Sequence, residues 1–355
     1  MIIDAHVHCS GQERTTEVLQ SLDDAGIDMA VLLAPFLSEG FSLDDPQSLV
    51  RANEHVASLV RGEEDRLVGF AVVDPRDPNA PQLLRHAVQT LGLRGCKMVP
   101  TGWYPYDREV QPVFAVAHEL EIPLLFHSGI FIDGRNGRFC RPTFFEALRD
   151  FPGLRVTLAH LGWPWTDEAI AVGLIDLIHG VPHNDVMFRF DLSFGPPPPY
   201  RLETLSKALQ VLGPGLLQFA SDCFLPCSGA HIAERRGWVV DLLDELKVDE
   251  AGRERIWWGT AAAWLGLDIE AGAPSKVGQS NAAAAATRDA AALAQRRATS
   301  ALLNPIGMSP DDPDFIHAPD CLPTTRRRRL FSDLASARDR DLPGESRPFR
   351  FNACC

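Results

Sequence analysis

Short apolar runs alternate with longer amphipathic stretches from the start of the chain to about Leu267. The runs are rich in Val, Ile, Leu and Phe and too continuously apolar for strands with one face in water, so they predict buried parallel strands. Eight such strands are expected, at residues 2–8, 29–35, 67–74, 93–100, 122–129, 155–162, 186–193 and 216–223. The stretches between them predict helices at residues 13–25, 46–61, 80–91, 110–120, 142–150, 167–178, 202–211 and 231–246.

Strands that alternate with helices in this way predict a parallel sheet with helices outside it. Eight repeats within about 250 residues favour a closed (β/α)8 barrel, the TIM barrel, over an open doubly wound sheet. A further helical segment, residues 250–267, contains three tryptophans and is expected to close the outer wall. We therefore expect the barrel domain to span residues 1–270.

The character of the chain changes after Ile269. Residues 271–355 combine an Ala-rich run at 282–286, an Arg block at 326–329 and scattered prolines, without a strand pattern. This composition predicts a low-complexity tail that is largely disordered, with one helix at 282–303. The Arg block is interpreted as part of a solvated tail rather than as a nucleic-acid or partner patch.

The formal net charge of −13 argues against nucleic acid or an anionic membrane as the main partner, since both require a basic surface. No signal-peptide pattern opens the chain, and no run approaches the roughly 18 apolar residues of a membrane span. We expect a cytoplasmic protein that acts on a small molecule. The sequence leaves the oligomeric state open, a homo-oligomer included.

The eight cysteines show no paired C-x-x-C spacing, so reduced thiols that bind no metal are expected. Cys9, Cys96 and Cys223 adjoin candidate site residues in sequence. The alternation of side chains along a strand turns these three thiols toward the helices, where they would serve packing.

Metal-capable side chains fall at the C-terminal ends of the predicted strands. In a parallel barrel these ends converge on one mouth, where barrel enzymes carry their active sites. The residues concerned are His6, His8, Lys97, His127, His160 and Asp222. The other histidines lie on helical or loop segments and are expected mostly at the surface: His55, His86, His118, His179, His183, His231 and His317.

The His-x-His spacing on the first strand directs both imidazoles to the same side, because residues i and i+2 of a strand share a face. His127 and Asp222 arrive from other strands. Three imidazole nitrogens and one carboxylate oxygen suit Zn²⁺, with Mn²⁺, Fe²⁺ or Co²⁺ also accepted, and leave room for a water. A buried ionised aspartate without a cation beside it would be costly, which further favours a metal site.

The ordered motifs along the chain resemble those of the amidohydrolase superfamily, closest to its amidohydrolase-2 branch. The resemblance covers about residues 1–267, and a usual Asn in the closing segment is replaced by Thr260. The motifs are Ile3-Asp4-Ala5-His6-Val7-His8, Gly95-Cys96-Lys97, Phe126-His127-Ser128-Gly129, Ala159-His160-Leu161-Gly162, Ala220-Ser221-Asp222 and Gly259-Thr260-Ala261-Ala262 with Leu265-Gly266-Leu267.

By this resemblance, His6, His8, His127 and Asp222 are the metal ligands. Asp222 would also take the proton from the metal-bound water, and His160 would orient that water or polarise the substrate. In binuclear relatives a lysine at the position of Lys97 is carbamylated and bridges two metals. The amidohydrolase-2 branch resembles a one-metal design, so we expect Lys97 to contact an anionic group of the substrate.

The loops after the strands are expected to form the substrate pocket. Trp103, Tyr104 and Trp163 would supply aromatic walls, and Arg141 would bind a carboxylate in a bidentate fork unless it forms a surface ion pair. These features suggest a small cyclic or aromatic carboxylate as substrate.

We therefore expect a metal-dependent hydrolase in which water attacks a lactone, amide or related centre. Non-oxidative decarboxylation of a small aromatic or unsaturated acid is the main alternative, because the same residues serve either reaction and the resembled branch contains both. A non-catalytic binding protein on the same barrel is the third reading; no ligand position is lost, which speaks against it.

Overall fold

The structure is a computed structural model that describes residues 1–193 and 195–268. Its strands form one sheet in the order β8-β7-β6-β5-β4-β3-β2-β1-β9, and every neighbouring pair is parallel. The strands are β1 (Ile3–His8), β2 (Met29–Leu33), β3 (Leu67–Val72), β4 (Gly95–Met98), β5 (Leu124–Phe126), β6 (Val156–Leu158), β7 (Phe188–Asp191), β8 (Leu217–Gln218) and β9 (Cys223–Phe224).

The sheet closes on itself through β8 and β9, which are the two ends of the eighth predicted strand. β8 pairs with β7, and β9 pairs with β1. Between them the Ala5 N–H donates to the Phe219 carbonyl at 3.1 Å, and the Asp222 N–H donates to the His6 carbonyl at 2.9 Å. The eighth segment thus bonds to both neighbours, and the predicted (β/α)8 barrel is confirmed.

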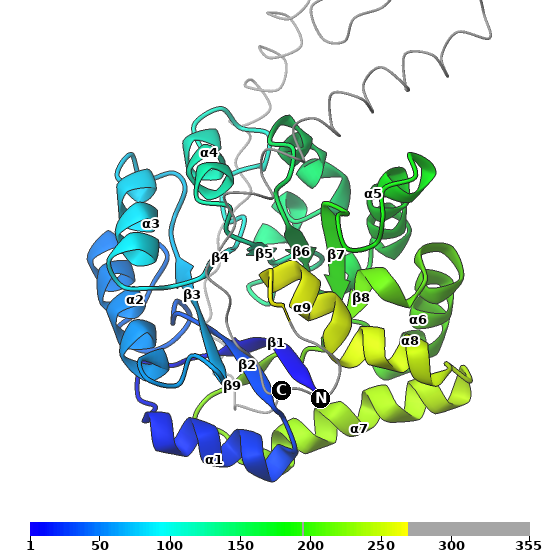
Figure 1. The fold of residues 1–355 in the computed structure, drawn as a ribbon. Helices are drawn as coiled ribbons and strands as arrows, with labels where there is room; N and C mark the ends of the chain where they lie inside the picture. Colours follow the sequence, from blue (N-terminus) through cyan, green and yellow to red (C-terminus); the bar gives the residue numbers. More distant parts are fainter. Residues whose placement is uncertain (194, 269–355) are drawn as a thin grey trace, which may run out of the picture. The chain divides into compact units, whose positions relative to one another are not determined.

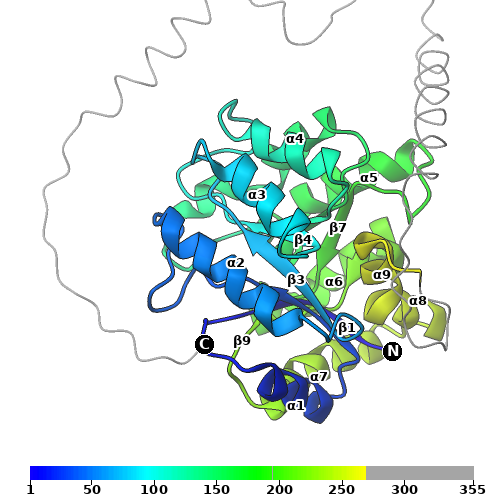
Figure 2. The ribbon, with the colours of Figure 1, turned by 60° about the vertical axis from the view of Figure 1, so that its left-hand side comes forward.

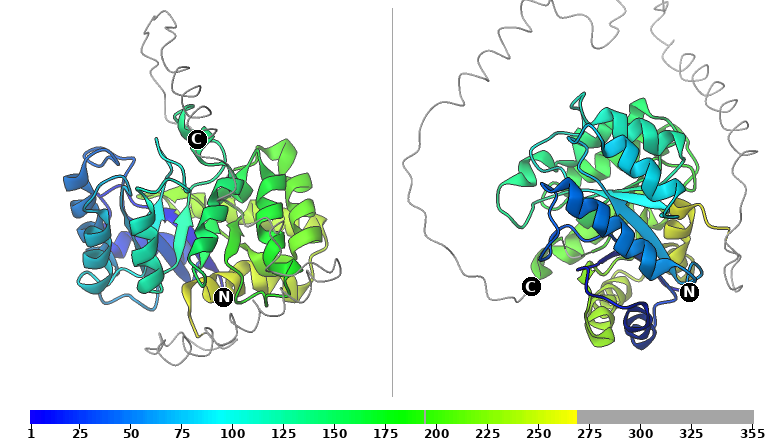
Figure 3. Two further views of the ribbon diagram at one scale, coloured as in Figure 1. Left: turned by 90° about the horizontal axis from the view of Figure 1, so that it is seen from above. Right: turned by 90° about the vertical axis from the view of Figure 1, so that its left-hand side faces the viewer.

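Helices surround the strands, as Figures 1 and 3 show. The α-helices are α1 (Thr15–Ala25), α2 (Pro46–Val60), α3 (Ala80–Gln89), α4 (Gln111–Glu119), α5 (Thr166–Ile178), α6 (Pro198–Leu212), α7 (Gly229–Glu245), α8 (Glu250–Glu254) and α9 (Thr260–Leu265). Local sequence fixes several ends. Asp45 caps α2 by accepting from the Gln47 N–H, and α1 stops at Gly26, whose φ of 67° a glycine adopts without strain.

The predicted α-helix at 142–150 is wrong in type, because Pro142–Asp150 forms a 3₁₀ helix. Its buried side chains are Pro142, Phe145 and Leu148, a spacing of three that matches the three residues per turn of a 3₁₀ helix. The strand predicted at 155–162 is also shorter than expected. It ends at Leu158, and Ala159–Gly162 forms a tight turn at the barrel mouth.

Two apolar layers hold the barrel together. The outer layer lies between strands and helices and includes the thiols of Cys9, Cys96 and Cys223, as expected from alternation. The inner layer fills the lumen opposite the mouth. There Ile3 and Ala5 of β1 lie in one cluster with Phe70 of β3 and Trp264 of α9. α9 therefore plugs the end where β1 begins, near the N-terminus (Figure 2).

The tail predicted at 271–355, with its helix at 282–303, lies outside the described residues. Within residues 1–193 and 195–268, no helix is long and apolar enough to cross a membrane. His55, expected at the surface, is half-buried and lies 2.9 Å from the buried Glu13 carboxylate.

Candidate active site

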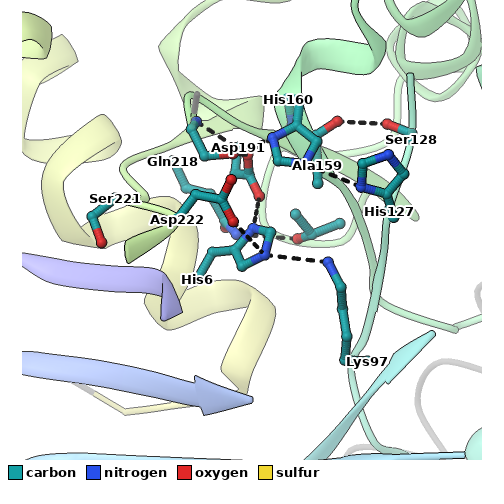
Figure 4. Close-up of polar contacts among 12 residues, drawn as sticks. His6, Lys97, His127, Ser128, Ala159, His160, Asp191, Gln218, Ser221 and Asp222 are labelled. Atoms are coloured by element: carbon teal, nitrogen blue, oxygen red, sulfur yellow. Dashed lines mark hydrogen bonds and ion pairs between the residues drawn. The ribbon is translucent and has the colours of Figure 1, made fainter. Parts of the chain in front are cut away.

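The candidate residues gather where the strands end (Figure 4). His6 and His8 come from the last residues of β1, and Lys97 comes from β4. His127 follows β5 directly, and Asp222 lies between β8 and β9. Burial is nearly complete for the four basic residues, whereas the Asp222 side chain keeps 18% of its surface exposed and gives solvent a way in.

Three of the predicted ligands form a compact group. The Nε2 atoms of His6 and His8 lie 3.0 Å apart. Asp222 Oδ1 lies 3.2 Å from His6 Nε2 and 3.1 Å from His8 Nε2. These atoms can therefore contact one cation, and the ligand atoms of the group all lie within 4.8 Å of one another.

The fourth predicted ligand, His127, stands beside this group rather than in it. Its Nδ1 lies 3.2 Å from His160 Nε2, and its Nε2 lies 2.9 Å from the Ile130 carbonyl oxygen. Lys97 Nζ, 3.2 Å from His6 Nε2, points toward the three-residue group from its own strand (Figure 4). The structure thus joins His6, His8 and Asp222 and pairs His127 with His160.

The backbone at two site residues is left-handed, with φ of 55° at Asp222 and 63° at His160. Asp and His are among the residues that tolerate this region best, yet it still costs about 1–3 kcal/mol unless the surroundings enforce it. Hydrogen bonds supply that enforcement. The Asp222 N–H donates to the His6 carbonyl, and the His160 N–H donates to Asp191 Oδ1 at 2.8 Å. Both side chains are thereby aimed at the mouth.

The contacts of His6 show which ring nitrogen carries its proton. Nδ1 lies 3.0 Å from Asp191 Oδ2, and an ionised carboxylate only accepts hydrogen bonds. Nδ1 therefore donates, and Nε2 presents a lone pair. That lone pair faces the Asp222 carboxylate, so two acceptors meet at 3.2 Å. Such a meeting favours a cation: the Lys97 ammonium lies 3.2 Å from the same Nε2, and a metal ion bound by the two acceptors would also suit them.

His127 is fixed in the same way by a carbonyl. The Ile130 oxygen 2.9 Å from Nε2 can only accept, so Nε2 carries the proton and Nδ1 presents a lone pair. The lone pair points toward His160. His127 thus offers a ligand atom to the mouth although it is not part of the compact group.

The pKa values at the site give the candidate ligands the protonation states in which they bind metals. Burial lowers the pKa of Lys97 to about 8, against the opposing effect of Asp222 and Asp191. Burial would raise the pKa of Asp222, but His6 and His8 hold it well below its usual range. Burial, aided by the Lys97 charge, lowers the pKa of His6 to about 4. Near pH 7 the imidazole is neutral and the carboxylate ionised, the forms that bind metals.

A family model for the amidohydrolases, the amidohydrolase-2 model, matches residues 3–267. The match spans most of the chain. The protein belongs to the amidohydrolase family. It is therefore an amidohydrolase-related enzyme, the family is metal-dependent, and the group of His6, His8 and Asp222 fits that dependence. Among curated proteins, none matches the chain.

Solved structures with the same fold include enzymes of two reaction types. 2,6-Dihydroxybenzoate decarboxylase from Rhizobium is 17% identical with a TM-score of 0.56, covering 76% of this chain and 99% of its own. 5-Carboxyvanillate decarboxylase from Novosphingobium aromaticivorans, complexed with manganese and a nitrobenzoic acid, is 17% identical with a TM-score of 0.55 over 75% and 96%. A putative 2-pyrone-4,6-dicarboxylic acid hydrolase from Pseudomonas putida is 20% identical with a TM-score of 0.51 over 76% and 98%.

The residues expected to line the amidohydrolase's pocket lie in varied places. Trp103 is 1% exposed and packs against Phe114 in the outer layer. Tyr104 stacks on Tyr106 at 5.0 Å. Trp163 lies 6.0 Å from the Tyr200 ring. Trp103 therefore packs between strands and helices and not at the mouth of the barrel, where a substrate would bind.

Arg141 forms a surface ion pair, the alternative to substrate binding that the sequence left open. Its guanidinium is exposed and forms an ion pair with Glu168, and it also lies over the Trp165 ring at 5.6 Å. A carboxylate partner already occupies the fork that a substrate carboxylate would need. Lys97 is accordingly the cation that the structure places against the candidate ligands.

Sequence reasoning missed the aromatic rings that flank the histidines. Phe224 stacks on His8 at 4.3 Å with an interplanar angle of 10°, and Phe36 lies edge-on to the same imidazole at 5.4 Å. Phe131 packs against His127 at 4.8 Å. Phe224 directly follows the Asp222-Cys223 segment, which was the only hint in the sequence.

Sequence reasoning also missed Asp191 and Ser193. Asp191 ends β7 and contacts both His6 and His160, and Ser193, two residues later, contacts His160. A signal was present, since the seventh predicted strand carries a carboxylate, Asp191, near its end, and no role was assigned to it. Only the closed barrel brings β7 near β1, with the eighth segment between them.

Proposed function

We propose that this amidohydrolase is a metal-dependent hydrolase in which an activated water attacks a small carboxylate-bearing substrate, such as a lactone or an amide. The observation that carries the proposal is the convergence of acceptor atoms at the mouth. The Nε2 lone pair of His6 and the Asp222 carboxylate meet at 3.2 Å, with His8 Nε2 at 3.0 Å from His6. Neutral imidazoles with one ionised carboxylate suit a divalent cation.

His6, His8 and Asp222 would hold the metal, with His127 as the fourth ligand. Nitrogen ligands with one carboxylate favour Zn²⁺, and Mn²⁺, Fe²⁺ or Co²⁺ also suit them. A bound divalent metal would lower the pKa of water toward 7 and polarise a carbonyl group. The chain itself supplies the rest of the chemistry.

Asp222 accepts the proton of the attacking water and passes it to the leaving group, since its carboxylate is ionised and partly open to solvent. His160, beside His127, orients the water. Lys97 holds the substrate carboxylate as the buried cation of the site. Glu168 leaves Arg141 less suited to that task.

Decarboxylation of a small aromatic or unsaturated acid is a second candidate, favoured by the aromatic rings at the mouth. Phe36, Phe131 and Phe224 flank the imidazoles of His8 and His127. A flat apolar substrate would pack against such rings with a gain of about 0.5–1.5 kcal/mol per ring pair. In this reaction Lys97 would again face a carboxylate.

The two reactions differ in whether an oxygen atom from water enters the product. The protein loaded with Zn²⁺ or Mn²⁺ is incubated in H₂¹⁸O with a panel of small lactones, amides and hydroxybenzoic acids. Hydrolysis should place one ¹⁸O atom in the product, whereas decarboxylation should release CO₂ from a substrate carboxylate and replace it with hydrogen. Release of CO₂ from one of the acids, with no ¹⁸O-labelled acid formed from the lactones or amides, would overturn the hydrolase in favour of the second candidate.

Metal content distinguishes the one-metal design from a two-metal design. Elemental analysis of protein purified without chelator should give about one equivalent of Zn or Mn per chain. Two equivalents would contradict that design and make Lys97 a carbamylated bridge. Protein that holds no metal, and takes up none when supplied, would refute the proposal.

A further inference from the structure

We propose that Asp191 and Ser193 are positioning residues that fix which ring nitrogen of His6 and His160 carries the proton. The functional importance of these two tautomers rests on the proposed metal site, but the tautomers themselves do not require a metal. The side chains of Asp191 and Ser193 are both buried, and both lie outside the predicted ligand set.

The two carboxylate oxygens of Asp191 form hydrogen bonds with different segments of the chain. Oδ2 lies 3.0 Å from Nδ1 of His6 on β1. Oδ1 accepts the backbone N–H of His160 at 2.8 Å and that of Ser193 at 3.1 Å. Backbone amides can only donate, so Oδ1 is an acceptor whatever the side chains do. One carboxylate therefore links β1 to the segments that follow β6 and β7 at the mouth.

Ser193 extends this control to the His160 ring. Its hydroxyl has a single proton, and its Oγ is in close hydrogen-bond contact with Asp191 Oδ1. The proton must lie between these two oxygens, because two bare acceptors would repel. Oγ then has only lone pairs to offer His160 Nδ1, which lies 2.7 Å away. Nδ1 of His160 consequently donates, and its Nε2 presents a lone pair.

This tautomer prevents His160 and His127 from satisfying each other. His127 also presents a lone pair, from Nδ1, and it lies 3.2 Å from His160 Nε2. If His160 carried its proton on Nε2, it would donate to His127 and close the pair as an ordinary hydrogen bond. Ser193 keeps the Nε2 lone pair of His160 available for a cation or a water proton, and the Ile130 carbonyl does the same for the Nδ1 lone pair of His127.

The test uses the full chain without metal and with ¹⁵N-labelled histidine. Long-range ¹H–¹⁵N spectra distinguish Nδ1–H from Nε2–H imidazoles. In the parent protein, His160 should show Nδ1–H, assigned by loss of its signals in His160→Gln. In Ser193→Ala the ring loses its acceptor, so we expect a shift to Nε2–H. Ser193→Thr keeps a hydroxyl and should restore the parent spectrum.

Ser128→Ala is the matched control. Ser128 Oγ donates to the Ala159 carbonyl at 2.5 Å, next to His160 but not to its ring. The same atom is deleted from the same neighbourhood, and the His160 tautomer should not change. An unchanged tautomer in Ser193→Ala, or an equal change in Ser128→Ala, would overturn the inference.

Asp191→Asn tests the other oxygen. An amide nitrogen facing His6 Nδ1 would donate, which should move the His6 proton to Nε2 and remove the lone pair. Loss of a partner behind a ligand typically weakens metal binding about 10–100-fold, so Zn²⁺ affinity by calorimetry should fall by that factor. A parent-like His6 tautomer in this variant would refute the role of Asp191. Failure of the parent to bind Zn²⁺ would instead refute the proposed function and leave the tautomer result standing.

Discussion

The two ends of the barrel lumen differ in polarity, although strand β1 contributes residues to both: one end is apolar and the other is charged. At the closed end, Ile3 and Ala5 are fully buried with Phe70, and Trp264 of α9 packs 5.1 Å from that ring. At the mouth, β1 ends in His6 and His8 among charged partners.

The chain thus places the residues that stabilise the barrel at one end of the lumen and the residues that could bind metal and substrate at the other. The closed end buries apolar surface, which stabilises the fold by about 25 cal/mol per Å². The mouth buries carboxylates and an ammonium, which cost free energy unless each finds a partner. Changes at the closed end should therefore lower stability, and changes at the mouth should alter metal binding and activity.

The largest effect should follow from replacing both histidines of the His-x-His pair at the mouth. In His6→Ala/His8→Ala, two nitrogens of the compact group are lost, so metal retention and turnover should disappear while the circular dichroism spectrum persists. His86→Ala, an exposed histidine on α3, is the control and should keep the metal. Full metal occupancy in the double variant would remove the central claim.

At the closed end, Trp264→Ala should have the next largest effect. The side chain is fully buried, and deleting such a residue costs about 3–5 kcal/mol through lost burial and the cavity left behind. Urea unfolding of the metal-free chain would measure it, with Tyr106→Ala, at a half-exposed ring, as the control. If the remaining folded protein loses its metal stoichiometry, the two ends are not separable.

Asp222→Asn should affect the rate without affecting the fold. Its carboxylate is the proposed proton carrier, and general bases contribute roughly 10²–10⁴-fold, so kcat should fall at least about a hundredfold. Steady-state kinetics with matched metal content, together with the melting temperature, would show this. A variant that turns over at the parent rate would refute the proton-transfer role.

The smallest effect concerns pH. Burial lowers the pKa of His6 to about 4, so the folded chain resists a proton that the unfolded chain accepts below about 6.5. This group's contribution is complete above pH 6.5 and is lost as pH falls toward 4, by at most about 1.4 kcal/mol per pH unit. Urea unfolding of metal-free parent and His6→Gln between pH 7 and 4 should show a shallower slope in the variant. Equal slopes would contradict the assignment.

The fold followed from local pattern because buried parallel strands and their helices are each legible over short stretches. Eight apolar runs predicted the barrel, and the strand ends predicted where His6, His8, Lys97 and Asp222 lie. Periodicity alone did not distinguish a 3₁₀ helix from an α-helix at Pro142–Asp150, since only the buried contacts select the turn.

The pocket was harder to predict because loops place side chains through distant contacts. Arg141 depends on Glu168 from α5, and the rings around His8 come from Phe36 after β2 and from Phe224 in β9. No local pattern links these segments. Asp191 likewise gains its role only from β1, which is distant in sequence.

What the sequence determined by itself is the alternation of strands and helices and the chemistry at the strand ends, because both depend on neighbouring residues. Tertiary structure decided which of those groups meet. The irregular register of β1 between Asp4 and Val7 lets Ile3 and Ala5 fill the closed end while His6 and His8 face the mouth together. Closure through the eighth segment then brings Asp222 against them, because hydrogen bonds to β1 fix a backbone conformation that its own sequence would rarely adopt.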